Sequence, residues 1–143
     1  MEGGYTDLFS SRQDSSVVEI KMPRGFQILD NKAKDVKMQF IQPEFRGKNG
    51  LVMFYAPWCP HCQNMASTWL ELANVTKGLY PVGAINCDDS KSGNNLLADY
   101  FKVSGYPTIK IWNGSEFTDY TGGRELKDFL QFLCVSNGLC DLV

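Results

Sequence analysis

The strongest constraint on the fold is a short apolar run that leads directly into two closely spaced cysteines. Residues 51–56 read Leu-Val-Met-Phe-Tyr-Ala, which is the length and composition of a strand buried on both faces of a sheet. Cys59 and Cys62 follow in the sequence Trp-Cys-Pro-His-Cys, and apolar residues from Met65 to Ala73 then recur at helical spacing. This order places a Cys-x-x-Cys pair between the end of a buried strand and the start of a helix.

That position favours reactive thiols. A cysteine at a helix start lies close to unpaired backbone N–H groups and to the positive end of the helix dipole. Both stabilise the thiolate, which is the nucleophile, so we expect Cys59 to form a mixed disulfide and Cys62 to release it. His61, the single histidine of the chain, would add positive charge or a hydrogen bond toward the Cys59 sulfur. The alternative is that His61 is a solvated loop residue without influence.

Apolar patterning along the rest of the chain predicts a mixed sheet covered by helices. The other predicted elements are strands at residues 17–22, 81–86, 107–112 and 116–120, and helices around residues 96–101 and 124–134. Asn113 and Gly114, a dipeptide favoured in tight hairpin turns, join the last two strands. The order strand-helix-strand-helix-strand-strand-helix predicts an α/β fold with parallel crossovers and one terminal hairpin. Residues 25–49 carry no clear signal.

Length and composition indicate one domain. A chain of 143 residues with 43% hydrophobic residues can bury its own core, which we assign to residues 16–143. Residues 1–15 are polar and typical of a flexible leader. The formal net charge of −2, without a basic stripe, argues against nucleic acid or a membrane as partner. The first residues lack a signal segment, which predicts a cytoplasmic protein; the alternative is the secretory pathway, if the chain is a processed fragment.

Three further cysteines have no evident chemical role. Cys87, Cys134 and Cys140 can be buried small hydrophobes or idle thiols, and a disulfide between Cys134 and Cys140 is a second alternative. The chain has no second Cys-x-x-Cys, so Cys59 and Cys62 lack the further ligands that a zinc or iron–sulfur site needs. We therefore expect neither a metal nor another cofactor.

Three ordered sequence blocks match the pattern of a known family. Residues 54–66 read Phe-Tyr-Ala-Pro-Trp-Cys-Pro-His-Cys-Gln-Asn-Met-Ala, residues 103–110 read Val-Ser-Gly-Tyr-Pro-Thr-Ile-Lys, and residues 120–124 read Tyr-Thr-Gly-Gly-Arg. Together they resemble a catalytic domain of the protein disulfide isomerase branch of the thioredoxin family. The resemblance covers roughly residues 45–135 and implies a thioredoxin fold, with a central mixed β-sheet flanked by helices.

The resemblance also implies roles for individual residues. Cys59 corresponds to the exposed attacking cysteine, and Cys62 corresponds to the more buried resolving cysteine. Arg124 corresponds to an arginine that family members move toward the resolving cysteine, where it favours the thiolate. The alternative for Arg124 is an ordinary solvated residue at a helix start.

A substrate platform is implied beside the cysteines. Pro107 corresponds to the family's cis-proline, and the backbone of Tyr106 would pair with an extended substrate. Trp58 would form a wall of the substrate site, with simple packing as its alternative.

Five positions depart from the family's pattern. Pro60 and His61 stand where disulfide isomerases usually have Gly-His and thioredoxins have Gly-Pro, and Pro-His resembles a strongly oxidising bacterial member. Met53 replaces a buried acidic residue and Ala84 replaces its lysine partner, so no single charge is isolated in the core. Ser67 replaces a proline that bends the active-site helix, which predicts a straighter helix.

These observations predict reversible dithiol–disulfide exchange with cysteine-containing protein substrates, without a cofactor. An unidentified redox partner would return the Cys59–Cys62 pair to its starting redox state. The alternative is a module that holds peptides at Tyr106 and Pro107 without redox turnover. The intact Cys59–Cys62 pair favours the enzyme, since a pure binder needs neither sulfur.

Overall fold

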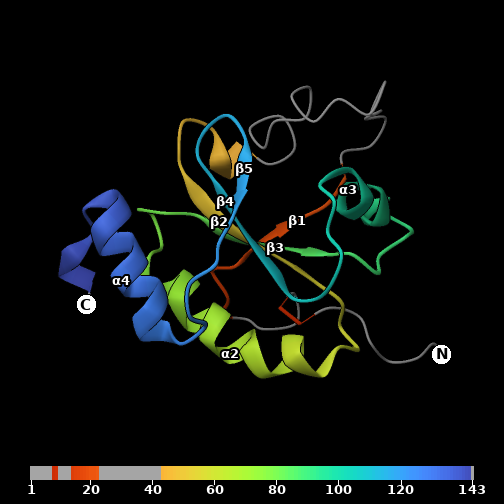
Figure 1. Cartoon of the computed structure of the whole chain (residues 1–143), viewed down its shortest axis with the longest axis horizontal. Helices are drawn as coiled ribbons and strands as arrows, with labels where there is room; N and C mark the ends of the chain where they lie inside the picture. Colours follow the sequence, from red (N-terminus) through yellow and green to blue (C-terminus); the bar gives the residue numbers. More distant parts are fainter. Residues whose placement is uncertain (1–7, 10–13, 23–42, 143) are drawn as a thin grey trace.

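The computed structural model describes residues 8–9, 14–22 and 43–142, and its strands form one mixed sheet (Figure 1). The strands are β1 (Val18–Ile20), β2 (Gly50–Tyr55), β3 (Val82–Asn86), β4 (Thr108–Trp112) and β5 (Phe117–Asp119). The helices are α2 (Pro60–Val75), α3 (Asn94–Tyr100) and α4 (Leu126–Asn137), with short 3-10 turns η2 (Pro43–Phe45) and η3 (Cys140–Leu142). The spatial order is β1-β3-β2-β4-β5, in which β1 and β2 run parallel to β3, and β4 is antiparallel to β2 and β5. The predicted α/β thioredoxin fold is confirmed.

Helices cover both faces of the sheet (Figure 1). Helices α2 and α4 pack on one face, over a core that includes Met53, Cys62, Trp69 and Phe129. Helix α3 covers the other face, over a smaller core that includes Phe54. The central strand β2 is buried along its whole length, as its continuous apolar run predicts.

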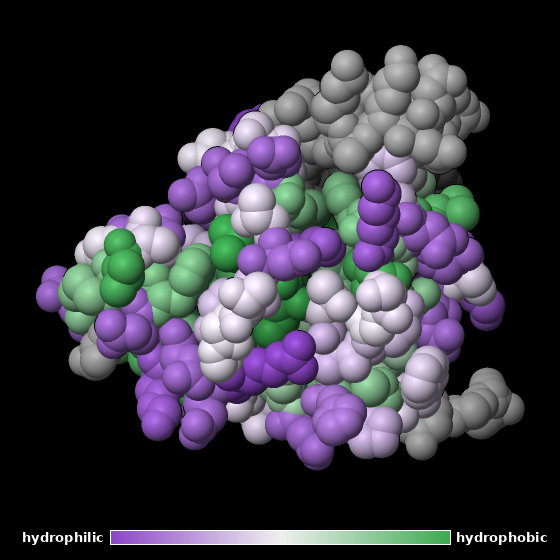
Figure 2. Space-filling model, viewed as in Figure 1, coloured by the Kyte–Doolittle hydropathy of each residue, from purple (hydrophilic) through white to green (hydrophobic). Residues whose placement is uncertain are grey.

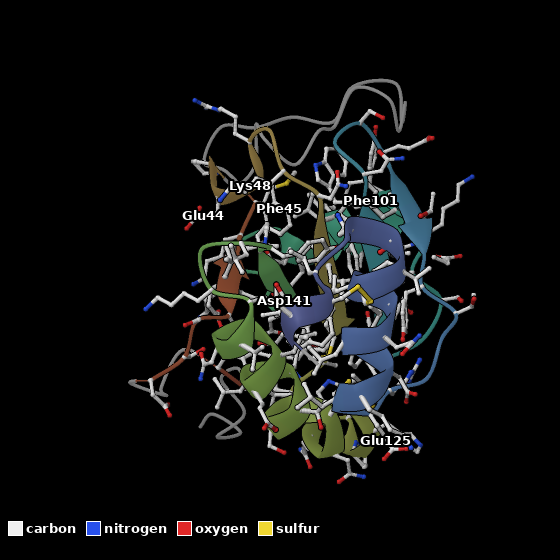
Figure 3. All side chains as sticks on the ribbon, turned by 90° about the vertical axis from the view of Figure 1, so that its left-hand side faces the viewer. Glu44, Phe45, Lys48, Phe101, Glu125 and Asp141 are labelled. Carbon is white, nitrogen blue, oxygen red and sulfur yellow. A yellow bond between two sulfur atoms is a disulfide. The ribbon has the colours of Figure 1, made fainter. Side chains whose placement is uncertain are left out.

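The start of β2 is packed closely enough to require glycine. Phe45 of η2, labelled in Figure 3, is fully buried against this strand. A methyl group at Gly50 would collide with the Phe45 ring and approach the Pro81 carbonyl oxygen to 2.8 Å. This contact fixes the start of the strand that leads to the cysteines.

The boundaries of α4 differ from the predicted range of residues 124–134. The helix begins at Leu126, because Glu125 and Asp128 form a reciprocal capping box at its start. It ends at Asn137, because Gly138 adopts a left-handed conformation with φ of 71°. Both signals are present in the sequence, and the apolar periodicity alone missed them.

Two residues of the predicted leader contact the core. The Phe9 ring is fully buried and lies edge-on to Tyr55, with ring centroids 5.6 Å apart. The Leu8 backbone N–H donates a hydrogen bond to the Tyr55 hydroxyl at 3.3 Å. Residues 1–7 and 10–13 of the leader, and residues 25–42 of the unassigned segment, lie outside the described residues.

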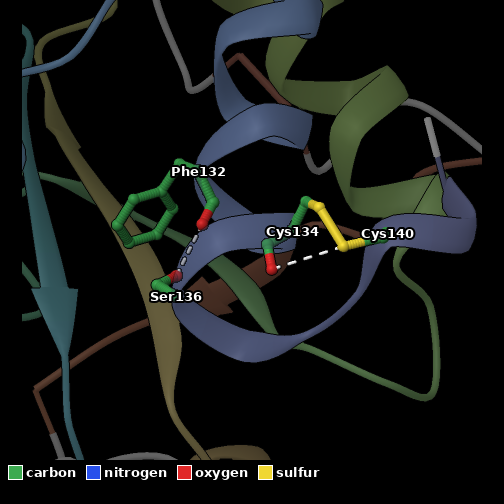
Figure 4. The surroundings of a disulfide bond; sticks show 4 residues. All are labelled: Phe132, Cys134, Ser136 and Cys140. Atoms are coloured by element: carbon green, nitrogen blue, oxygen red, sulfur yellow. Dashed lines mark hydrogen bonds between the residues drawn. A yellow bond between two sulfur atoms is a disulfide. The ribbon is translucent and has the colours of Figure 1, made fainter.

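A disulfide joins Cys134, in the last turns of α4, to Cys140 in η3 (Figure 4). Of the alternatives for these two cysteines, the structure has the disulfide. Its Cα atoms are 4.2 Å apart, and the bond holds η3 against the end of α4. Cys59, Cys62 and Cys87 are free thiols.

Hydrophilic side chains are spread over the face of the molecule seen in Figure 2, with apolar residues showing between them. Among the described residues, no helix has the length and apolar character needed to cross a membrane.

Candidate active site

The Cys-x-x-Cys pair lies where β2 ends and α2 begins, as the sequence predicts. The Cys59 backbone N–H donates to the Ala56 carbonyl at 3.1 Å, which closes a turn between strand and helix. Cys59 is the N-cap residue, and Pro60 occupies the first helical position. A backbone N–H at that position has no acceptor within the helix, so proline costs no hydrogen bond there. The Gln63 side-chain amide donates to the Pro57 carbonyl at 2.7 Å and fixes the same turn.

The two thiols differ in access and in acidity. Cys59 is 7% exposed, whereas Cys62 is completely buried. Burial raises the pKa of Cys59, but hydrogen bonds from the Cys62 backbone and thiol and from the His61 backbone outweigh it, so the net pKa is lowered. Burial raises the pKa of Cys62 to about 12, although a hydrogen bond from the Ala56 backbone and the charge of Arg124 oppose the rise.

His61 lies at the surface between the two cysteines. Its contribution to the lowered Cys59 pKa comes from its backbone N–H. The predicted contribution of the imidazole stays a prediction.

Tyr106 and Pro107 lie against the reactive sulfur. The peptide bond between them is cis, as the resemblance implies. The Cys59 Sγ is 3.6 Å from the Tyr106 carbonyl oxygen and donates to it as a thiol. The Trp58 ring lies edge-on to the Tyr106 ring, with centroids 6.4 Å apart, and is 51% exposed. Tyr106 therefore contacts Cys59 directly, while Trp58 packs on the Tyr106 ring and Pro107 follows it in the chain.

Arg124 lies at the same platform and not on the Cys62 sulfur. Its Nη2 donates a hydrogen bond to the Pro107 carbonyl oxygen at 3.1 Å. From this position its positive charge lowers the pKa of Cys62. Arg124 thus connects the start of α4 with the cis-proline segment.

Cys87 belongs to the surroundings of the site, which the sequence analysis missed. It follows β3 directly, and its backbone N–H donates to the Tyr55 carbonyl at 2.8 Å. Its buried thiol donates to the Ile85 carbonyl at 3.6 Å, and burial raises its pKa to about 12, although the Tyr106 side chain and the Tyr55 backbone oppose the rise. A usable signal existed, because the carboxyl ends of parallel strands meet at one edge of a sheet and Cys87 ends the strand beside β2.

Within residues 8–9, 14–22 and 43–142, no three His, Cys, Asp or Glu side chains gather as they would around a metal ion. The site brings together two thiols, the Tyr106 carbonyl and the nearby guanidinium of Arg124.

Known proteins share this fold and sequence pattern. The family model described as thioredoxin matches residues 31–134. Protein disulfide-isomerase like 2-2 of Arabidopsis thaliana is 38% identical over 102 residues, which cover 66% of this chain and 22% of that protein. Protein disulfide-isomerase A6 of Mus musculus is 45% identical over 76 residues, 52% of this chain and 16% of that protein. The crystal structure of the J-Trx1 fragment of ERdj5 superposes with a TM-score of 0.59 at 27% identity, over 85% of this chain and 50% of that one.

The five-stranded mixed sheet and the Cys59–Cys62 pair at the start of α2 define a thioredoxin-like domain. The chain belongs to the thioredoxin family. It spans about a fifth of the length of the curated relatives, at 22% and 16% for the two proteins above.

Proposed function

We propose that the chain exchanges disulfides with the cysteines of protein substrates through Cys59 and Cys62. The observation that carries the proposal is the asymmetry of the pair at one helix start. Cys59 keeps a small exposed area and has a lowered pKa, whereas Cys62 is completely buried and has a raised pKa. A thiolate is the attacking species, so Cys59 attacks first and Cys62 acts second.

The exchange balances as two successive displacements. The Cys59 thiolate attacks one sulfur of a substrate disulfide, forms a mixed disulfide and expels the other substrate sulfur as a thiolate. Cys62 then loses its proton and attacks the Cys59 Sγ, which expels the second substrate thiolate and leaves a Cys59–Cys62 disulfide. The substrate gains two electrons and the pair loses two; the reverse sequence oxidises a substrate dithiol.

The platform at Tyr106 supports a peptide as the substrate. A backbone segment beside Cys59 can use the exposed side of the Tyr106–Pro107 segment for main-chain hydrogen bonds. The half-exposed Trp58 ring offers apolar contact area next to it. This arrangement recognises chain conformation more than side-chain identity.

A redox titration separates exchange from peptide binding without turnover. The Cys87→Ser variant is equilibrated in glutathione buffers, and the free thiols of Cys59 and Cys62 are counted by alkylation and mass spectrometry. We expect one cooperative transition in which both thiols disappear together. Absence of that transition, with the protein still folded, would favour the binding module.

We also propose an oxidising compartment. The Cys134–Cys140 disulfide is of the kind that persists in secretory compartments and is rare in the cytosol. This favours the secretory alternative over the cytoplasmic expectation.

A further inference from the structure

A polar cavity of about 210 Å³ opens beside the cis-proline. Lys102 and Ser104, from the segment between α3 and β4, form one side. Pro107 contributes from the platform, and Arg124 contributes from the segment before α4. Pro107 directly follows Tyr106, whose carbonyl oxygen lies 3.6 Å from the Cys59 sulfur, so the cavity begins one residue along the chain from that contact.

Positive charge dominates the wall of this cavity. Lys110 and Asp119 also line it, but their side chains pair at 2.7 Å and offset one another. In the part of the chain that the structure describes, no carboxylate pairs with Lys102 or Arg124. Arg124 uses one nitrogen to hold the Pro107 carbonyl, which leaves its other N–H groups for a ligand. Two uncompensated cations thus face a space large enough for a side chain.

The backbone at Lys102 belongs to the turn that ends α3, in which the Val103 N–H donates to the Ala98 carbonyl at 2.9 Å and the Lys102 N–H donates to the Asp99 carbonyl at 3.1 Å. Lys102 adopts φ of 60°, in the left-handed region that glycine occupies without strain. This is the usual conformation of the residue that follows a helix C-cap, and it places Lys102 where α3 ends and the segment toward β4 begins. Lys102 is exposed and is one of the residues that line the cavity.

We infer that the cavity between Lys102 and Arg124 binds a carboxylate of the substrate, within a few residues of the reacting cysteine. The inference rests on the proposed exchange function. An extended peptide that pairs with the Tyr106–Pro107 segment carries its flanking side chains past this cavity. The carboxylate of an aspartate or glutamate there is attracted by two cations. A neutral amide of the same size gains no such charge–charge attraction.

The expected effect is modest and salt-dependent. Exposed ion pairs are weak individually, so we expect roughly a two- to fivefold preference for an acidic side chain at low ionic strength. Screening over a distance of about 10 Å at about 0.1 M salt reduces that preference as salt is added. A preference that salt does not change would point to shape and not to charge.

The test uses pairs of peptide disulfides that differ only by glutamate or glutamine at one position near the cysteine. Values of kcat/KM are measured for the unaltered protein, for Lys102→Gln and for Lys91→Gln, an exposed lysine that does not line the cavity. We expect a glutamate preference at one or two positions, loss of that preference in Lys102→Gln, and its retention in Lys91→Gln. All three proteins should turn over the glutamine peptides equally, because Lys102 does not touch the reacting sulfurs.

Glutathione disulfide is the second substrate, because its carboxylates could fill the same cavity. If Lys102→Gln lowers kcat/KM for glutathione disulfide and for none of the peptides, the cavity binds the carboxylate of a small thiol and not that of a protein. The inference is overturned if kcat/KM is equal for the two peptides of every glutamate and glutamine pair and Lys102→Gln does not change kcat/KM for glutathione disulfide. That result would leave the exchange function intact.

A binding measurement separates failure of the subsite from failure of exchange. The same peptides with alanine in place of cysteine are titrated while the backbone amide signals of Lys102 and Arg124 are followed by NMR. Selective shifts with the glutamate peptides, in a protein that turns over no disulfide, would support the subsite and reject the exchange function. Identical shifts with both peptides would count against the subsite.

Discussion

Met53 of β2 and Ala84 of β3 are register partners in adjacent parallel strands, and both side chains are buried. The family pattern has an acidic residue and a lysine at these positions, so a charge pair has been replaced here by two apolar side chains. Met53 and Ala84 lie in the same core cluster as Cys62. Neither position can therefore supply a base for the proton of the resolving thiol.

Release of a mixed disulfide should accordingly depend strongly on pH. Burial raises the pKa of Cys62 to about 12, so its thiolate fraction rises about tenfold per pH unit through the neutral range. Stopped-flow kinetics between about pH 6 and about pH 9 should show release accelerating throughout, while the initial attack by Cys59 levels off at lower pH. A flat release profile would mean that another group already serves as the base.

The Met53→Glu variant should be less stable, because it places an unpaired carboxylate in the core beside Ala84. The cost is on the order of several kcal/mol after the protein relaxes around the charge. Burial raises the folded pKa of such a carboxyl, so the loss of stability appears as pH rises above the unfolded value of about 4.3. Urea unfolding at acidic and at neutral pH measures it, with Met53→Leu as the control. Equal unfolding free energies for the glutamate and leucine variants would contradict this explanation.

The His61 backbone N–H should matter for the acidity of Cys59. His61→Pro removes that N–H, whereas His61→Ala keeps it and removes only the imidazole. We expect the Cys59 pKa to rise in His61→Pro, which makes the pair less oxidising, because the thiolate stabilises the reduced form. That stabilisation is complete above the unfolded thiol pKa of about 8.5 and is lost as pH falls through the lowered folded pKa. Thiolate absorbance against pH is the measurement; a larger shift in His61→Ala would assign the effect to the imidazole.

The Cys134–Cys140 disulfide should stabilise the end of α4 without taking part in exchange. Closing this short loop is worth about 2 kcal/mol in chain entropy. The double variant Cys134→Ser, Cys140→Ser should lose about that much unfolding free energy in urea and keep its kcat/KM on a peptide disulfide. A large loss of exchange in the folded double variant would assign these cysteines a redox role.

Elements with strong local signals were predictable from the sequence. The apolar run of β2 and the turn at Asn113 and Gly114 each encode their structure within a few residues. The thiol pair was predictable for the same reason, since a strand end, two cysteines and a helix start are consecutive. The bounds of α4 were missed because the cap at Glu125 and the glycine at position 138 override apolar periodicity.

Features that depend on tertiary packing were not predictable in this way. Phe9 lies in a polar segment, and only its contact with Tyr55 makes it a core residue. The effect of the Tyr106 side chain on Cys87 joins the segment after β3 with the segment before β4. The cavity at Lys102 likewise needs α3, β4 and the start of α4 to be in place.

Trapping of mixed disulfides tests the order of attack most directly. Cys59→Ser and Cys62→Ser are each incubated with a peptide disulfide, and adducts are identified by mass spectrometry after acid quenching. The account predicts that Cys62→Ser accumulates an adduct on Cys59, because attack proceeds and release does not, and that Cys59→Ser accumulates none on the buried Cys62. Equal trapping by the two variants, or trapping by Cys59→Ser alone, would contradict the assignment of Cys59 as the nucleophile.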